Sequence, residues 1–209
     1  MKHEWRKKEK QIYIPKVTPE LIEIPEFNFF TIEGEGNPNN PNFADYIGVL
    51  YSLSYTLKMG LKKGNSIKKH EDYTVYPLEG VWDINEKAKK TYSENTTLNK
   101  DDLIFKLMIR QPHFITSELA IETINQVKQK KYHPLLEKVK FEKITEGKCV
   151  QMLHVGSYDN EPITFKIMEE FAENQQLKRV SKVHREIYLS DFRKVSAEKL
   201  KTVLRFNVK

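Results

Sequence analysis

The same order of predicted elements occurs twice along this chain, and this internal duplication constrains the fold more than any other feature of the sequence. The stretches 29–60 and 149–178 each run from an apolar strand through a glycine turn and an Asn/Pro segment into an amphipathic helix. Each helix is followed by a strand that carries a glutamate and by an apolar strand that carries an arginine. The repeated β-α-β-β order predicts an α+β fold of two halves related by a pseudo-twofold axis.

The two predicted halves fit within one domain of 209 residues. The first half covers about 12–112 and the second about 141–209, with a linking helix at about 116–132 between them. In a β-α-β-β unit the helix covers only one face of the sheet. Two such units side by side are therefore expected to leave their other faces lining a shared central groove, which is a common place for a ligand site.

Apolar residues recur at three- and four-residue spacing in each predicted helix, as expected for helices with one buried face. In the first helix they are Phe43, Ile47, Leu50, Leu57 and Leu61. In the second they are Ile163, Ile167, Met168 and Phe171. In the linking helix, which Ser117 is predicted to cap, they are Ala120, Ile124 and Val127.

Composition restricts the class of protein. The chain has 39% hydrophobic and 31% charged residues, as soluble globular proteins do. Its one cysteine, Cys149, excludes an internal disulfide and favours a reducing compartment such as the cytoplasm. The charged start and the short apolar run near 47–57 predict neither a secretory signal nor a membrane span. The net charge is +6, but Lys and Arg are mixed with Glu, so we expect no specific nucleic-acid binding.

Two glutamates occupy matching places in the two halves. Glu79 lies in the strand after the first helix, and Glu186 lies in the strand after the second. If the halves pack about a twofold axis, both carboxylates can approach the centre of the groove. A carboxylate between apolar neighbours is costly unless it is solvated, paired or bound to a ligand. The alternative to a ligand-binding role is an ion pair with Arg110 or Arg205 on the adjacent strand.

Aromatic residues accompany both glutamates. Tyr188 lies two positions beyond the second glutamate, so it faces the same side of a regular strand. Tyr76 and Trp82 lie near Glu79. Trp82 is three positions from it and would face the opposite side unless Gly80 introduces a bulge. Aromatic walls with carboxylates suit a delocalised cation, which stacks and is attracted to the ring faces. The alternative for each ring is core packing.

No part of the sequence predicts a metal or cofactor site. Cys149 lacks a nucleophile motif and is predicted to be a small buried hydrophobe. His154 is predicted to be a core histidine with satisfied hydrogen bonds, and His113 and His133 have no partners at metal-ligand spacing. We therefore expect no metal and no cofactor. The sequence leaves the oligomeric state open.

Several strings resemble the GyrI-like small-molecule-binding family, which is related to the effector-binding domains of AraC-type and multidrug-sensing MerR-type regulators. They are IYIPKVTPELIEIPEFNFFTIEGEGNPN, YPLEGVWD, LMIRQPHFIT and REIYLSDFRKVSAEKLKTVLRF, and the resemblance covers about Ile12 to Val208. It implies a duplicated β-α-β-β fold whose central groove holds an acidic residue. The REIYLSD match carries that residue over to Glu186, and the EGVW match adds Glu79 and Trp82.

The resemblance implies three functions for a stand-alone member. Some members resemble multidrug-binding proteins that take lipophilic, aromatic and often cationic drugs and dyes. Others detoxify DNA-alkylating natural products by hydrolysing a cyclopropane ring; the catalytic residues here would then be Glu79 and Glu186. Gyrase-inhibitory relatives imply a protein-interaction module instead. The chain shows no DNA-binding domain, so it is not expected to act alone as a repressor or activator.

Overall fold

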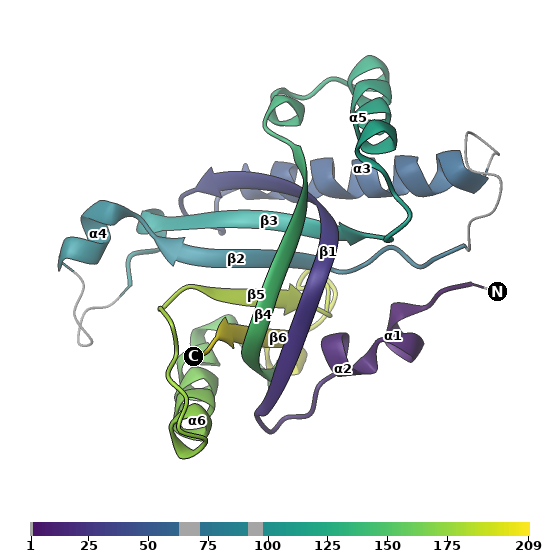
Figure 1. The fold of residues 1–209 in the computed structure, drawn as a ribbon. Helices are drawn as coiled ribbons and strands as arrows, with labels where there is room; N and C mark the ends of the chain where they lie inside the picture. Colours follow the sequence, from purple (N-terminus) through teal and green to yellow (C-terminus); the bar gives the residue numbers. More distant parts are fainter. Residues whose placement is uncertain (1, 63–71, 92–97) are drawn as a thin grey trace.

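One closed antiparallel sheet forms the centre of the computed structural model, which describes residues 2–62, 72–91 and 98–209 (Figure 1). In the order of their pairing, the strands are β1 (Glu20–Glu35), β3 (Leu103–Gln111), β2 (Leu78–Ile84), β5 (His184–Tyr188), β6 (Lys201–Asn207) and β4 (Lys140–Val155). β4 pairs back with β1 and closes the sheet.

Three longer helices and several short helical turns accompany the sheet. The longer helices are α3 (Phe43–Lys62), α5 (Ser117–Lys130) and α6 (Glu161–Asn174). The short α-helices are α1 (Trp5–Lys8), α2 (Lys10–Tyr13) and α4 (Glu86–Thr91). The 3-10 turns are η1 (Lys100–Asp102), η2 (Pro134–Glu137), η3 (Tyr158–Asn160) and η4 (Ala197–Lys199). None of the helices in the described ranges is long and apolar enough to cross a membrane.

The two halves follow the predicted order. β1-α3-β2-β3 corresponds to β4-α6-β5-β6, which confirms the α+β class and the duplication. Two of the three corresponding strand pairs are neighbours in the sheet, β1 with β4 and β2 with β5, which fits a pseudo-twofold arrangement. β1 and β4 each begin nine residues before the apolar run that predicted them. The additional residues pair with each other, from Glu20 opposite Gln151 to Thr31 opposite Lys140.

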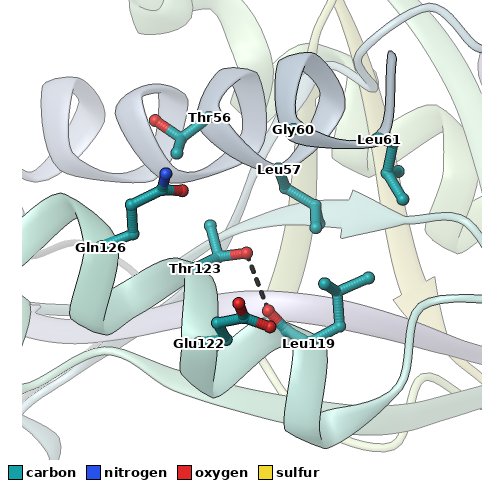
Figure 2. A pocket seen from close by; sticks show the side chains of 8 residues that line it. All are labelled: Thr56, Leu57, Gly60, Leu61, Leu119, Glu122, Thr123 and Gln126. Atoms are coloured by element: carbon teal, nitrogen blue, oxygen red, sulfur yellow. Dashed lines mark hydrogen bonds between the residues drawn. The ribbon is translucent and has the colours of Figure 1, made fainter. Parts of the chain in front are cut away.

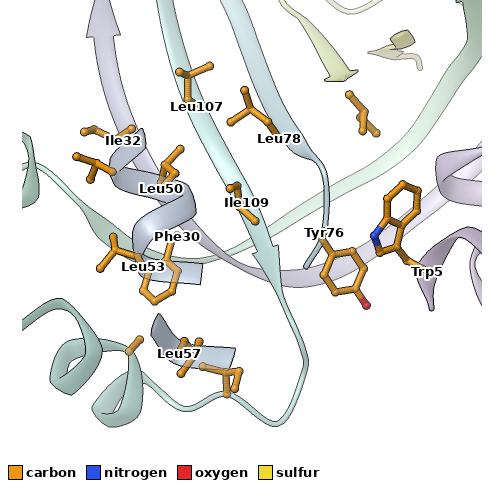
Figure 3. Packing of buried hydrophobic residues seen from close by; sticks show 14 of the residues in the cluster. Trp5, Phe30, Ile32, Leu50, Leu53, Leu57, Tyr76, Leu78, Leu107 and Ile109 are labelled. Atoms are coloured by element: carbon orange, nitrogen blue, oxygen red, sulfur yellow. The ribbon is translucent and has the colours of Figure 1, made fainter. Parts of the chain in front are cut away.

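The main core lies between α3 and the strands of the first half. Figure 3 shows Leu50, Leu53 and Leu57 of α3 facing apolar side chains of the sheet. The predicted stripe is confirmed for Leu50, Leu57 and Leu61, which are buried, and Phe43 and Ile47 pack partly buried against the same core. Each buried leucine stabilises the fold by about 2 kcal/mol relative to an exposed one.

The face that α6 buries differs from the predicted one. Ile163 is 64% exposed and Ile167 is 41% exposed, whereas Met168 is fully buried, as predicted. The helix instead turns these residues toward the protein: Glu161, Thr164, Met168 and Ala172. Met168 and Ala172 pack in a second core with strand residues such as Leu204 and Phe206, and Phe171 of the predicted stripe is partly buried against it.

The linking helix α5 packs beside α3 (Figure 1). Its cap is Thr116, whose hydroxyl accepts a hydrogen bond from the Leu119 backbone N–H, rather than the predicted Ser117. Ala120 and Val127 are buried as predicted, while Ile124 is only partly buried and Thr123 takes its place.

Candidate functional site

The seam between β2 and β5 separates the predicted site residues onto two faces of the sheet. Across this seam, Gly80 pairs with Glu186 and Trp82 pairs with His184. Directly paired residues of antiparallel strands point to the same face, and neighbours along a strand alternate. Glu186 therefore shares one face with Trp82 and Tyr188. Glu79 points to the other face.

The expectation that both glutamates approach one groove is therefore not met. A twofold axis perpendicular to an antiparallel pair keeps equivalent side chains on the same face of the sheet, as directly opposite residues are. Glu79 stands opposite Ile187, and Glu186 stands opposite Gly80. The two glutamates are one residue away from being symmetry-related, and a shift of one residue turns a side chain to the other face.

An acidic and aromatic cluster forms on the outer, helix-covered face of this seam; we call it the seam site. Its members are Trp82, Tyr158, Glu161, Glu186 and Tyr188. The indole Nε1 of Trp82 donates a 2.8 Å hydrogen bond to the hydroxyl of Tyr188. Tyr158 meets Tyr188 edge-on, with ring centroids 6.1 Å apart. Tyr188 thus contacts the other two rings of the site, Trp82 and Tyr158.

Gly80 forms the floor of the seam site. A Cβ atom at this position would lie 2.7 Å from Nε1 of Trp82 and 3.2 Å from the hydroxyl of Tyr188. The pairing of β2 with β3 runs without interruption from Leu78 to Ile84, so the bulge considered for Gly80 does not occur. The glycine instead leaves space for the two rings.

Glu186 lies in this aromatic surrounding without a lysine or arginine partner among the described residues. Glu186 is only 8% exposed. Its nearest basic group is His184, whose Nε2 lies 3.1 Å from Oε1. The other ring nitrogen of His184, Nδ1, lies 3.2 Å from the carbonyl oxygen of Lys182. A carbonyl oxygen can only accept a hydrogen bond, so Nδ1 is the donor in this contact. Burial and the negative charge of Glu186 raise the pKa of Tyr158 to about 12.

A second carboxyl, that of Glu161, lies against Glu186. Glu161 is the first residue of α6 and is 7% exposed. Its Oε1 has no hydrogen-bond partner in the described structure. Burial, together with the charge of and a hydrogen bond to Glu186, raises the pKa of the Glu161 carboxyl well above its usual value. Glu161 therefore retains a proton to a higher pH than an ordinary glutamate.

Sequence reasoning missed Glu161, although its spacing held a signal. Positions 161, 164, 168 and 172 recur at helical spacing and form the buried face of α6. The start of this helix is fastened to β4 by His154, whose two ring nitrogens lie 2.8 Å from the Thr164 hydroxyl and 3.0 Å from the Ser157 carbonyl. This contact fixes the side of α6 that faces the seam.

On the inner face of the seam, Glu79 is part of a buried ion network. It is 2% exposed, and its Oε2 lies 2.7 Å from Nη1 of Arg185. Arg185 also approaches Glu146, which in turn pairs with Arg205 at 2.9 Å. The ion-pair alternative therefore applies to Glu79, with Arg185 in place of the arginines expected from the sequence. The negative charge of Glu79 is compensated within the protein.

Tyr76 also lies away from the seam site. Its hydroxyl donates a 2.7 Å hydrogen bond to Glu9, and its ring lies under the guanidinium of Arg110 at 4.6 Å. Arg110 in turn forms an ion pair with Glu9. Figure 3 shows Tyr76 next to Trp5 of α1. Of the five predicted site residues, the structure thus gathers Glu186, Tyr188 and Trp82 and separates Glu79 and Tyr76.

Cys149 and His154 have structural environments. Cys149 is fully buried, and burial raises the pKa of its thiol to about 12, which keeps it protonated. His154 is buried with both ring nitrogens partnered, as predicted. In residues 2–62, 72–91 and 98–209, no three His, Cys, Asp or Glu side chains are grouped to hold a metal ion.

A small pocket lies elsewhere, between α3 and α5 (Figure 2). It is lined by Thr56, Leu57, Gly60, Leu61, Leu119, Glu122, Thr123 and Gln126. The hydroxyl of Thr123 donates to the carbonyl of Leu119 one turn earlier, so it is already satisfied. The cavity volume of about 40 Å³ holds water rather than a drug-sized molecule.

Comparisons with known proteins place this geometry in a family context. Residues 18–209 match the model of the GyrI-like small molecule binding domain. A conserved protein from Listeria innocua is 34% identical in sequence, and its crystal structure matches this one with a TM-score of 0.88. The match covers 99% of this chain and 100% of that one. A hydrolase from Listeria innocua is 33% identical with a TM-score of 0.85 and the same coverage.

A more distant likeness concerns the fold alone. The C-terminal domain of EcmrR is 15% identical with a TM-score of 0.50, covering 92% of this chain and 97% of that domain. A search of curated proteins gave no match.

Proposed function

The chain belongs to the GyrI-like small-molecule-binding domain family, and on this premise we propose that it binds flat, lipophilic aromatic cations at the seam site. Glu186 would compensate the charge of the ligand, and Trp82 and Tyr188 would stack against its rings. Sequestering such drugs or dyes would make the protein a multidrug-binding, detoxifying protein. The single cysteine, buried and without a disulfide partner, fits a reducing compartment such as the cytoplasm.

One observation carries this proposal: the carboxylate of Glu186 is buried among aromatic rings, and its one basic contact in the described ranges is the imidazole of His184, with no lysine or arginine partner. Burying a charge in this way is costly unless a counter-charge arrives. Aromatic faces attract cations, and they do so most strongly where water is excluded. A delocalised organic cation supplies both a counter-charge and the apolar surface. Glu79 supports the same reasoning by contrast, since Arg185 already compensates its charge.

The proposal is tested by titrating the protein with acridine orange, a flat cationic dye, and following its fluorescence. Glu186→Gln keeps the shape of the side chain and removes its charge. We expect the dissociation constant to rise by roughly ten- to a hundredfold, because a charge-assisted contact in a partly dry site is lost. An isotherm of Glu186→Gln that superimposes on that of the unaltered protein would contradict the proposal.

A second candidate function is hydrolysis, and the Listeria innocua hydrolase at 33% identity favours it. We propose the addition of water to an activated cyclopropane. The water oxygen would bond to a ring carbon, the strained carbon–carbon bond would break, and a conjugated carbonyl would accept the electron pair. Glu186 would take the proton of the water as general base. The protonated Glu161 beside it could then return a proton to the developing enolate, since two neighbouring carboxyls can hold different protonation states.

A further inference from the structure

Glu161 occupies a place in the seam site that its ordinary packing does not explain. The buried face of α6 is otherwise uncharged, with Thr164, Met168 and Ala172. At its first turn this face directs a carboxyl against the carboxyl of Glu186. Two acidic groups side by side destabilise a fold unless they share a proton or bind a partner.

The atoms of Glu161 are only partly satisfied. Its Oε1 is buried and has no hydrogen-bond donor in the part of the chain that the structure describes. The titratable groups that surround the carboxyl pair are Tyr158, Asp159, Tyr188 and His184, of which only His184 carries a positive charge when protonated. His184 contacts Glu186, so apart from the hydrogen bond within the carboxyl pair no donor in the described ranges reaches the Oε1 of Glu161.

We propose that Glu161 is a specificity-determining residue: its unpartnered oxygen accepts a hydrogen bond from an N–H of a cationic aromatic ligand while Glu186 compensates the ligand's charge. The site then prefers cations that carry an N–H, such as protonated ring nitrogens or amidinium groups, over quaternary cations of the same shape. This inference rests on the proposed binding function and adds a chemical class to it.

The preference follows from the cost of a buried acceptor. A ligand with an N–H satisfies the Glu161 oxygen, whereas an N-methyl group leaves it buried and unpaired. The raised pKa of Glu161 supports this arrangement, because a neutral carboxyl leaves the pair with a single negative charge to match a monocation. We expect a discrimination of roughly tenfold, the size of one satisfied buried hydrogen bond.

Two matched dyes test the inference at pH 7. Acridine orange carries one N–H, on its protonated ring nitrogen, and 10-methyl acridine orange has a methyl group in its place. The unaltered protein should bind acridine orange roughly tenfold more tightly. Glu161→Leu removes the acceptor and should bring the ratio of dissociation constants to about one. Glu161→Gln keeps an acceptor oxygen and should retain the preference. Glu170→Leu, an exposed position of the same helix, serves as the control and should not change it.

The outcomes separate this inference from the proposed function. Equal affinities of the unaltered protein for the two dyes, or a full preference in Glu161→Leu, would overturn the role of Glu161 while leaving dye binding intact. Binding that ignores Glu186→Gln would overturn the proposed function. Near-ultraviolet circular dichroism establishes that each variant is folded, and Glu161→Gln provides a second, shape-conserving variant should the leucine variant fail to fold.

Discussion

Glu79 and Glu186 stand at adjacent register positions of β2 and β5, yet their carboxylates lie on opposite faces of the sheet. On the inner face, Glu79 meets Arg185 at 2.7 Å and is electrically compensated. On the outer face, Glu186 meets aromatic rings and a second carboxyl. The same Glu→Gln substitution should therefore affect the stability of the fold at Glu79 and the affinity for the ligand at Glu186.

Glu79→Gln should reduce the free energy of unfolding by about 3 kcal/mol, because it leaves Arg185 with only part of its buried counter-charge. Glu146 stays near Arg185, which places the loss at the low end for a broken buried pair. The affinity for acridine orange should not change. Urea unfolding and dye titration measure the two quantities. A variant of unaltered stability that has lost the dye would show that Glu79 acts in binding.

Gly80→Ala should weaken dye binding by roughly tenfold or more, since a Cβ 2.7 Å from Nε1 of Trp82 forces the two rings of the site to move. Gly48→Ala is the control: apart from its chain neighbours and the backbone of α3 itself, no atom lies within 4 Å of the position where its Cβ would stand. That change should stabilise the helix by about 0.5–1 kcal/mol and leave binding alone. Unaltered affinity in Gly80→Ala would place the ligand elsewhere.

Tyr188→Phe and Tyr188→Ala should separate the ring from its hydroxyl. The phenylalanine variant keeps the stacking surface but leaves the Trp82 Nε1 without its acceptor, so it should lose about 1 kcal/mol of stability and little dye affinity. The alanine variant should also bind the dye roughly tenfold more weakly. If both variants remain folded and bind equally well, Tyr188 contributes packing only.

Glu161 should make stability decrease as the pH rises. Its folded-state pKa lies above the unfolded value, so the folded protein holds more protons than the unfolded chain between the two values. Stability is therefore fully retained below about pH 4, near the unfolded pKa, and is lost as the pH rises through the folded pKa. Glu161→Gln should abolish this component, so its melting temperature should exceed that of the unaltered protein more at pH 8 than at pH 5. A constant difference across this range would argue against the buried acid.

Hydrolysis should be visible as a gain of one water in the mass of a cyclopropane-bearing alkylator. Under single-turnover conditions, Glu186→Gln should slow that conversion by roughly a hundredfold or more while a neutral substrate still binds. Mass spectrometry of the products decides the outcome. An alkylator that is bound and recovered unchanged after long incubation would identify a sequestering protein and exclude this reaction.

The duplication, the three longer helices and the aromatic setting of Glu186 followed from the sequence, because apolar spacing and repeated order survive without knowledge of packing. The place of Glu79 did not follow. A repeat fixes which strands correspond, but the register between them depends on hydrogen bonds and side-chain packing, and an error of one residue reverses the face.

Glu161 was not predicted from the sequence, for a related reason. The isoleucines at 163 and 167 suggested a buried stripe, whereas the buried face runs through Thr164, Met168 and Ala172, and His154 of β4 contacts Thr164 at 2.8 Å. Contacts with the sheet decide the rotation of the helix, and these contacts are known only once the fold is assembled.

The closed sheet also has a consequence for the way this chain reaches its native state. Glu20 pairs with Gln151, which is 151 − 20 = 131 positions later, so the pairing of β1 with β4 must join remote parts of the chain. Closing such long loops slows folding. While the first half emerges from the ribosome, β1 and β2 are unpaired edges that invite association with other chains. Synthesis of the second half covers β1 with β4 and only later covers β2 with β5, so the nascent chain keeps an edge open to aggregation until β5 is complete.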